Sequence, residues 1–157
     1  MENETLGSAL EREHREIDGG IEAFTSSPVG GEIQTEPLTR AMMGLRRHIY
    51  LEEEFLFPPL REAGLVAPIF VMLREHGEMW RTLDALDTEL AGGTSSAAVL
   101  DMCRELAAQL DAHNSKEEPI IYPQADGVLT DSASAELTAF LGSGRMPAGW
   151  VCQRALS

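Results

Sequence analysis

Residues 48–58 read HIYLEEEFLFP, and the same pattern recurs at residues 113–123 as HNSKEEPIIYP. In both stretches a glutamate follows the histidine by four residues, and an aromatic–proline pair closes the segment at the same offset. The other two histidines also repeat, because EHREI at residues 13–17 is echoed by EHGEM at residues 75–79. The chain therefore reads as a duplicated helical hairpin, and all four of its histidines fall inside the repeat.

Length, charge and cysteine content narrow the class of protein. A chain of 157 residues corresponds to about one domain and can bury a real core. Its 26 acidic and 12 basic residues give a formal charge of -14, which would repel a phosphate backbone, so we expect no nucleic-acid partner. No signal-peptide pattern and no bilayer-spanning apolar run is present, so we expect no membrane association. The two cysteines, Cys103 and Cys152, do not make a disulfide framework, which fits a cytoplasmic protein.

Apolar residues follow helical periodicity through most of the chain, and the alternation typical of strands is absent. Four helices of roughly twenty residues with short connections predict an all-α fold, an antiparallel up-down four-helix bundle. The expected helices run from about residue 6 to 24, from Thr35 (as a cap, with Pro37 in the first turn) to Pro58–Pro59, from Pro68 to Gly92–Gly93, and from Ser95 or Ser96 to Pro119.

The C-terminal part is expected to differ from the bundle. A short fifth helix is predicted at about residues 131–141, followed by an irregular tail that is rich in glycine and proline. Trp150 is expected to anchor this tail by packing. We therefore assign residues 1–125 to the bundle, and residues 126–157 to a C-terminal helix and tail packed on the same domain.

Histidine and carboxylate side chains are expected to converge inside the bundle. A histidine and a glutamate four residues apart share one helix face, and this pairing occurs on the second and the fourth helices. The other two histidines lie on core-facing stripes. Two carboxylates buried together are costly unless cations neutralise them, which suggests a pair of metal ions. The candidate metal ligands are His14, His48, Glu52, His76, His113 and Glu117.

The residue types restrict the kind of metal site. Imidazole with carboxylate and without thiolate suits iron, manganese or zinc. Cys103 lies nearly three turns before His113 and is expected to be a small buried hydrophobe. A ferritin-like di-iron site needs Glu-x-x-His on two helices, and only Glu11 with His14 has that spacing, so this class is excluded.

The order His, His-x-x-x-Glu, His, His-x-x-x-Glu on four helices resembles the hemerythrin-like, HHE cation-binding family over roughly residues 5 to 123. The resemblance implies a non-haem di-iron centre with two iron ions bridged by an oxo or hydroxo group; manganese and zinc are the alternatives. It also implies that the first two histidines serve one iron, that the last two serve the other, and that both glutamates bridge the pair.

Two positions depart from the pattern of oxygen-carrying hemerythrins. Those proteins have a second histidine one turn after the third-helix histidine, where this chain has Trp80, so one iron would be open to water, peroxide or another carboxylate. They also tend to place the last carboxylate at the position of Glu118 here, so Glu117 and Glu118 are both candidates for the bridge; the duplicated pattern favours Glu117. Asp18, one turn after His14, is the nearest spare carboxylate, and we expect it to be solvated or to cap a helix.

Other side chains near the histidines are assigned surrounding roles. Most of the neighbouring glutamates are expected to form a solvated face, although one could hydrogen-bond a ligand imidazole: Glu13, Glu53, Glu54, Glu75 and Glu78. An apolar wall is expected from Leu45, Ile49, Met72, Met79, Trp80, Leu106 and Leu110. Tyr50 and Tyr122 carry phenols capable of redox chemistry, and Tyr50 is expected to point away from His48.

Three functions follow from this reading. The first is a protein that binds or responds to O2 or a related small oxidant, such as NO or peroxide. The second is a di-iron enzyme that scavenges peroxide, in the manner of a catalase or peroxidase, or reduces NO at an open iron. The third is iron storage or a structural site, with iron or zinc doing no redox chemistry.

Overall fold

The structure is a computed structural model that describes residues 4–26, 35–92 and 96–156. Within these ranges the chain is helical and forms no strand, which confirms the predicted all-α fold. The helices are α1 (Leu6–Thr25), α2 (Glu36–Leu51), the π-helix η1 (Glu52–Leu56), α3 (Phe57–Glu62), α4 (Val66–Ala91), α5 (Ser96–Ile120), α6 (Tyr122–Val128) and α7 (Asp131–Ser143).

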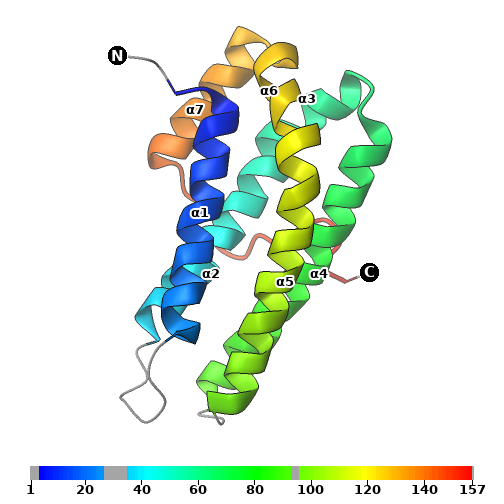
Figure 1. Ribbon diagram of the computed structural model, residues 1–157. Coiled ribbons are helices and arrows are strands. Elements are labelled where there is room, and N and C mark those ends of the chain that lie inside the picture. Colours follow the sequence, from blue (N-terminus) through cyan, green and yellow to red (C-terminus); the bar gives the residue numbers. More distant parts are fainter. Residues whose placement is uncertain (1–3, 27–34, 93–95, 157) are drawn as a thin grey trace.

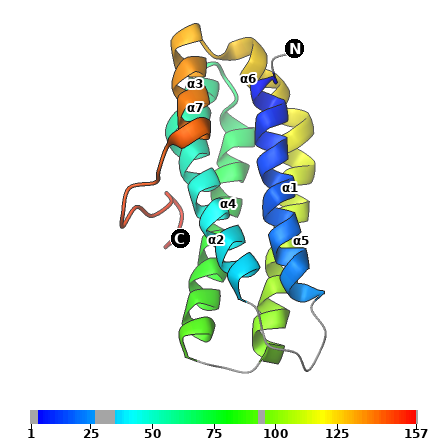
Figure 2. The ribbon, with the colours of Figure 1, turned by 90° about the vertical axis from the view of Figure 1, so that its left-hand side faces the viewer.

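The four long helices form an up-down bundle. Figures 1 and 2 show α1, α2, α4 and α5 running alongside one another, with α3, α6 and α7 gathered at the end where α1 begins. α1 packs mainly on α2, and α4 packs mainly on α5, as expected for a duplicated hairpin. No helix in the described ranges is long and apolar enough to cross a membrane.

Local sequence explains the start of α1 and only part of the start of α2. The Thr5 hydroxyl accepts a hydrogen bond from the Ser8 amide and so caps α1. The prediction that Thr35 caps α2 is wrong, because its side chain makes no capping hydrogen bond. Its backbone is already helical, with φ -82° and ψ -12°, whereas a capping side chain needs an extended backbone. Pro37 occupies the first turn of α2 as predicted. Ser95 lies outside the described residues.

The chain stays helical past the proline pair Pro58–Pro59, so the prediction that the second helix ends there is wrong. The regular α-helix α2 ends earlier, at Leu51. The π-helix η1 follows, and α-helical geometry begins again with α3 at Phe57. In η1 the backbone amide of Phe57 bonds to the carbonyl of Glu52, five residues back. The prolines fall in the first turn of α3, where a missing amide proton costs little.

The second hairpin is also interrupted before its aromatic–proline pair. α5 contains Pro119 and ends at Ile120, and α6 begins at Tyr122. α6 was not predicted from the sequence. The helices that follow the two interruptions begin at the same offset from the histidines, α3 at Phe57 and α6 at Tyr122, whereas the preceding α-helices end at different offsets, at Leu51 and Ile120.

Two apolar clusters make up the core. The Trp80 cluster comprises Ile17, Ile21, Phe24, Leu38, Ala41, Met42, Leu45, Ile49, Met79, Trp80, Leu83, Leu86, Val99, Cys103, Leu106, Leu110, Cys152 and Ala155. The Phe57 cluster comprises Leu6, Leu10, Leu51, Leu56, Phe57, Leu60, Ile69, Met72, Leu73, Ile121, Tyr122, Ala125, Leu137 and Phe140. Along α4, His76 falls between Leu73 of one cluster and Met79 of the other, so the histidines lie in a layer between the two clusters.

The C-terminal segment packs against the bundle through aromatic side chains. α7 begins at Asp131 as predicted and ends two residues later than expected, at Ser143. In the tail that follows, the Trp150 ring lies edge-on to Tyr50 and Trp80, with ring centroids 5.0 Å and 5.5 Å apart. The Trp150 indole also donates a hydrogen bond to Glu54. The expected packing role of Trp150 is confirmed by these contacts.

Candidate metal centre

The six predicted side chains come together in the middle of the bundle. Each is at most 3% exposed, although all are polar or charged. One histidine comes from each long helix, one glutamate opens the π-helix η1, and the other lies one turn after the histidine of α5. This burial follows from the helical stripes, since each histidine replaces one apolar position on the core-facing side of its helix.

Their donor atoms form two groups, and within each group the atoms lie within 4.8 Å of one another. The first donor group is His14, His48, Glu52 and Glu117; the second donor group is Glu52, His76, His113 and Glu117. Both glutamates belong to both groups. These buried His/Glu groups fit a metal-binding site in which two carboxylates are shared.

Glu52 extends one oxygen toward each group. Its Oε1 lies 3.0 Å from Nε2 of His76, and its Oε2 lies 3.4 Å from Nε2 of His48. The carboxylate therefore reaches across the bundle from α2 and η1 to α4. This is the geometry that a bridging carboxylate requires.

Glu117 does the same from the opposite side. Its Oε1 lies 3.1 Å from Nε2 of His14, and its Oε2 lies 3.2 Å from Nε2 of His113. Of the two candidate bridges, Glu117 is fully buried at the centre, whereas the side chain of Glu118 is 36% exposed. Glu118 instead contacts the outward nitrogen of His14, so the geometry favours Glu117 as the shared carboxylate.

All four imidazoles are held from outside by a carboxylate at their Nδ1 atoms. The sequence suggested that one of five neighbouring glutamates could hydrogen-bond a ligand imidazole. Three of those five do so, and Glu118 makes the fourth hydrogen bond of this kind. Nδ1 donation leaves each Nε2 directed at the centre with its lone pair available for a cation. The pairs are His14–Glu118 at 2.8 Å, His48–Glu13 at 2.8 Å, His76–Glu53 at 2.8 Å and His113–Glu75 at 3.0 Å.

Tyr122 lies at the centre of the site, although the sequence predicted only a phenol capable of redox chemistry and no place among the donor atoms. Its side chain is buried, and its hydroxyl lies among all four members of the first donor group. The distances are 2.8 Å to His14 Nε2, 3.0 Å to His48 Nε2, 2.8 Å to Glu52 Oε2 and 2.8 Å to Glu117 Oε1. The available signal was the aromatic–proline offset, which places Tyr122 in the second repeat where Phe57 stands in the first.

Phe57 occupies the corresponding place beside the second donor group. Its ring stacks on His76, with ring centroids 5.3 Å apart and an interplanar angle of 22°. The π-helix brings it there, because an i to i+5 hydrogen bond places residue 57 one turn above Glu52. The two donor groups therefore differ: a phenol hydroxyl lies inside the first, and an apolar ring covers one side of the second.

Two imidazoles of the centre have raised pKa values. Burial opposes protonation of His48, but the charge of Glu52 and the hydrogen bond to Glu13 raise its pKa to about 10. Likewise burial is outweighed at His113, where Glu117 and Glu75 raise the pKa to about 10. In both cases the charge of a shared carboxylate favours the protonated imidazole. A bound cation would supply positive charge in place of such a proton, since a ligating imidazole must give up its Nε2 proton.

The donor chemistry fits a metal ion. Glu117 Oε2 is buried without a hydrogen-bond partner in the described parts of the chain, although His113 Nε2 lies nearby. An unpaired buried carboxylate oxygen is costly, and a cation bound to it would remove that cost. Imidazole and carboxylate donors without thiolate suit iron, manganese or zinc.

The other residues that the sequence singled out near the site lie outside the two donor groups. Asp18 belongs to neither donor group and is exposed, lining a surface pocket with Asp111 and Glu118. Trp80 is buried against Trp150 and contributes no donor to either group. Burial raises the pKa of Cys103 to about 11, so its thiol remains protonated in the Trp80 cluster. The expected apolar residues Leu45, Ile49, Met72, Met79, Leu106 and Leu110 are all buried in the two clusters.

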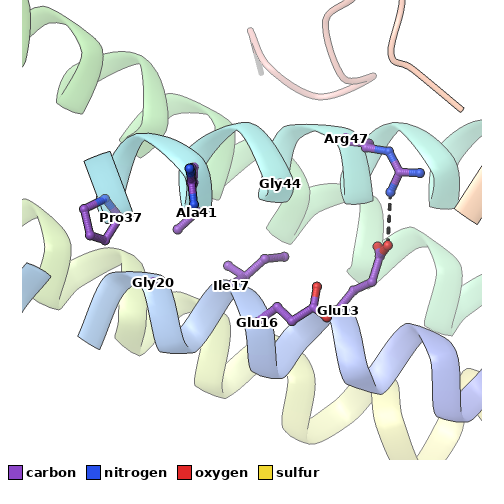
Figure 3. Close-up of a pocket in the computed structure, with 9 residues that line it drawn as sticks. Glu13, Glu16, Ile17, Gly20, Pro37, Ala41, Gly44 and Arg47 are labelled. Carbon is purple, nitrogen blue, oxygen red and sulfur yellow. Dashed lines mark hydrogen bonds and ion pairs between the residues drawn. The ribbon is translucent and has the colours of Figure 1, made fainter. Parts of the chain in front are cut away.

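A surface pocket of about 260 Å³ lies between α1 and α2. Figure 3 shows it lined by facing residues of the two helices, with the Glu13–Arg47 ion pair at one end. Glu13 also accepts the hydrogen bond from Nδ1 of His48. The wall of the pocket therefore includes the carboxylate that orients one imidazole of the first donor group.

Comparison with known proteins agrees with this geometry. The family model of the hemerythrin HHE cation binding domain matches residues 5–125. Uncharacterized proteins of Mycobacterium bovis and Mycobacterium tuberculosis are 30% identical over 91 residues, which covers 53% of this chain and 35% of each relative. The chain thus spans about a third of the length of these curated relatives. No solved structure shows significant similarity to the chain.

Proposed function

Because the chain belongs to the hemerythrin HHE cation-binding family, we propose that it holds two iron ions and binds or responds to O2 or a related small oxidant, such as NO or peroxide. One observation carries the proposal: Glu52 and Glu117 each belong to both donor groups. Two shared carboxylates between two pairs of imidazoles provide places for two ions side by side. A mononuclear structural site would leave one imidazole pair and several buried charges without a role.

The residues of the chain prepare this site before any ion arrives. The outer carboxylates orient the imidazoles, so that each Nε2 faces the centre. Bound iron would supply reversible electron transfer and an affinity for small oxidants. The apolar clusters on both sides exclude bulk water and favour small uncharged molecules over ionic ones.

The test is the metal content and the optical spectrum of the full chain after anaerobic loading with ferrous iron, followed by admission of air. We expect two irons per chain, one for each donor group, and new near-ultraviolet and visible bands after oxidation. The Glu52→Ala/Glu117→Ala double variant should lose both the metal pair and the bands. One iron or fewer without new bands would contradict the proposal, and retention of zinc alone would indicate a structural site.

A scavenging enzyme is the second candidate, and the composition of the second donor group favours it. That group has two imidazoles and the shared carboxylates, while Trp80, one turn after His76, packs on Trp150 instead of adding a donor. An ion with few protein ligands has a position open for turnover. Iron-loaded protein should then consume peroxide or NO faster than the Glu52→Ala/Glu117→Ala variant; equal rates would rule out this activity.

A further inference from the structure

We propose that Tyr122 is a fifth protein ligand to one metal ion, the ion held by His14 and His48, and that the two metal positions are therefore chemically unequal. This inference rests on the proposed metal pair and adds to it a ligand that the duplicated histidine–glutamate pattern does not contain. The observation behind it is the position of the Tyr122 hydroxyl within the first donor group.

The phenol oxygen lies at the place where a cation would touch every member of that group. Its distances to the four donor atoms fall between 2.8 Å and 3.0 Å. Metal–nitrogen and metal–oxygen bonds in such sites are about 2.0–2.2 Å long, as zinc illustrates. An ion that takes this central place needs the phenol oxygen to withdraw by roughly one bond length, which leaves that oxygen within bonding distance of the ion.

The hydrogen-bonding capacity of a phenol does not match these surroundings. A tyrosine hydroxyl has one proton to donate, yet carboxylate oxygens of both Glu52 and Glu117 lie 2.8 Å from it. The side chain of Tyr122 is 1% exposed, so water does not reach it readily. A cation resolves the conflict, because the carboxylates, the imidazoles and the phenol oxygen can all bind it. On binding, the O–H bond breaks, a metal–oxygen bond forms, the proton leaves for solvent, and no electron is transferred.

The two repeats differ at the position that Tyr122 occupies. Phe57 stands at the equivalent position, and it stacks on His76 without any oxygen to offer. The first ion would have five protein donors and the second ion four. Small oxidants would therefore bind at the second ion, beside Phe57, while Tyr122 closes the first.

The chain contains only two tyrosines, so one spectroscopic experiment can assign the ligand. Ferric-loaded wild type should show a visible phenolate-to-iron charge-transfer band, with tyrosine ring modes enhanced in its resonance Raman spectrum. Tyr122→Phe, which keeps the ring and loses the oxygen, should abolish the band and keep the iron content. Tyr50→Phe is the matched control and should leave the band unchanged, because Tyr50 packs against Phe55, Phe140 and Trp150.

The outcomes separate this inference from the proposed function. Two irons without the band, or a band that persists in Tyr122→Phe, would overturn the Tyr122 assignment and leave the metal pair intact. One iron with the band would contradict the metal pair and support the assignment. Failure to bind iron at all would overturn both. If Tyr122→Phe does not fold, the Tyr50→Phe variant can be labelled with ring-deuterated tyrosine, because Tyr122 is then the sole tyrosine. Enhanced Raman modes that shift on deuteration would assign the ligand to Tyr122, and modes that do not shift would reject the assignment.

Discussion

Nδ1 of His48 donates a 2.8 Å hydrogen bond to Oε1 of Glu13, so a residue of α1 orients an imidazole of α2. The same relationship recurs at every histidine, and the carboxylate always belongs to a different element from the imidazole that it holds. The Nε2 atoms are therefore aimed at the centre only when the bundle is assembled. The same packing that joins the helices therefore orients the imidazoles of the site.

Glu75 should affect metal affinity although it contributes no donor atom to the centre. Glu75→Ala removes the acceptor for Nδ1 of His113, and loss of such a partner typically weakens metal binding by about 10- to 100-fold. Glu78→Ala on the same helix is the matched control, because Glu78 is exposed and belongs to neither donor group. Competition with a coloured chelator measures both affinities; equal values for the two variants would contradict the orienting role.

Adjacent glutamates on α5 should have different effects. Glu117→Ala removes an oxygen from both donor groups, so we expect the full chain to lose at least one of its two ions. Glu118→Ala removes only the hydrogen bond to Nδ1 of His14, so the metal content should stay the same while affinity falls by about 10- to 100-fold. Metal analysis after gel filtration distinguishes them; the reverse pattern would show that Glu118 is the bridge.

Metal binding should raise thermal stability, because the centre exists only in the folded bundle. At a free-metal concentration a hundredfold above Kd, each bound ion adds about 2.7 kcal/mol. In a chain of this length that corresponds to a Tm increase of about 5–10 °C per ion. Thermal melting followed by circular dichroism, with and without chelator, measures the shift. A His14→Ala/His76→Ala variant should show a much smaller shift, and an equal shift would place the binding elsewhere.

Gly77 should be the glycine of α4 that tolerates no side chain. A β-carbon there would collide with the backbone carbonyl of Arg154, which belongs to the C-terminal tail. Overpacking of this kind costs about 1–3 kcal/mol. Gly19→Ala is the control, because nothing lies within 4 Å of its added β-carbon and alanine favours a helix by about 0.5–1 kcal/mol. Urea unfolding should rank Gly19→Ala above wild type and Gly77→Ala below it; equal stabilities would mean that the tail yields without cost.

The sequence alone was sufficient for the bundle and for the convergence of the six His/Glu side chains. Helical periodicity is a local property, so the apolar stripes of α1, α2, α4 and α5 predict which face of each helix is buried. A histidine within a buried stripe must then point inward, and a glutamate one turn later follows it. The prediction that the second helix ends at Pro58–Pro59 failed, because the π-helix places both prolines in the first turn of α3, where a proline is tolerated.

Only the tertiary structure decided which groups surround those six side chains. Tyr122 and His14 are 108 positions apart, and Glu118 and His14 are 104 apart. Contacts of that kind depend on the rotation of each helix about its axis and on the helix interruptions before Phe57 and Tyr122, neither of which periodicity specifies. The sequence therefore determined the likeness of the two repeats. The sequence also contains their difference in residue type, a tyrosine in one repeat where the other has a phenylalanine. Packing across the bundle decided that the phenol oxygen lies within one donor group and that the phenyl ring stacks beside the other.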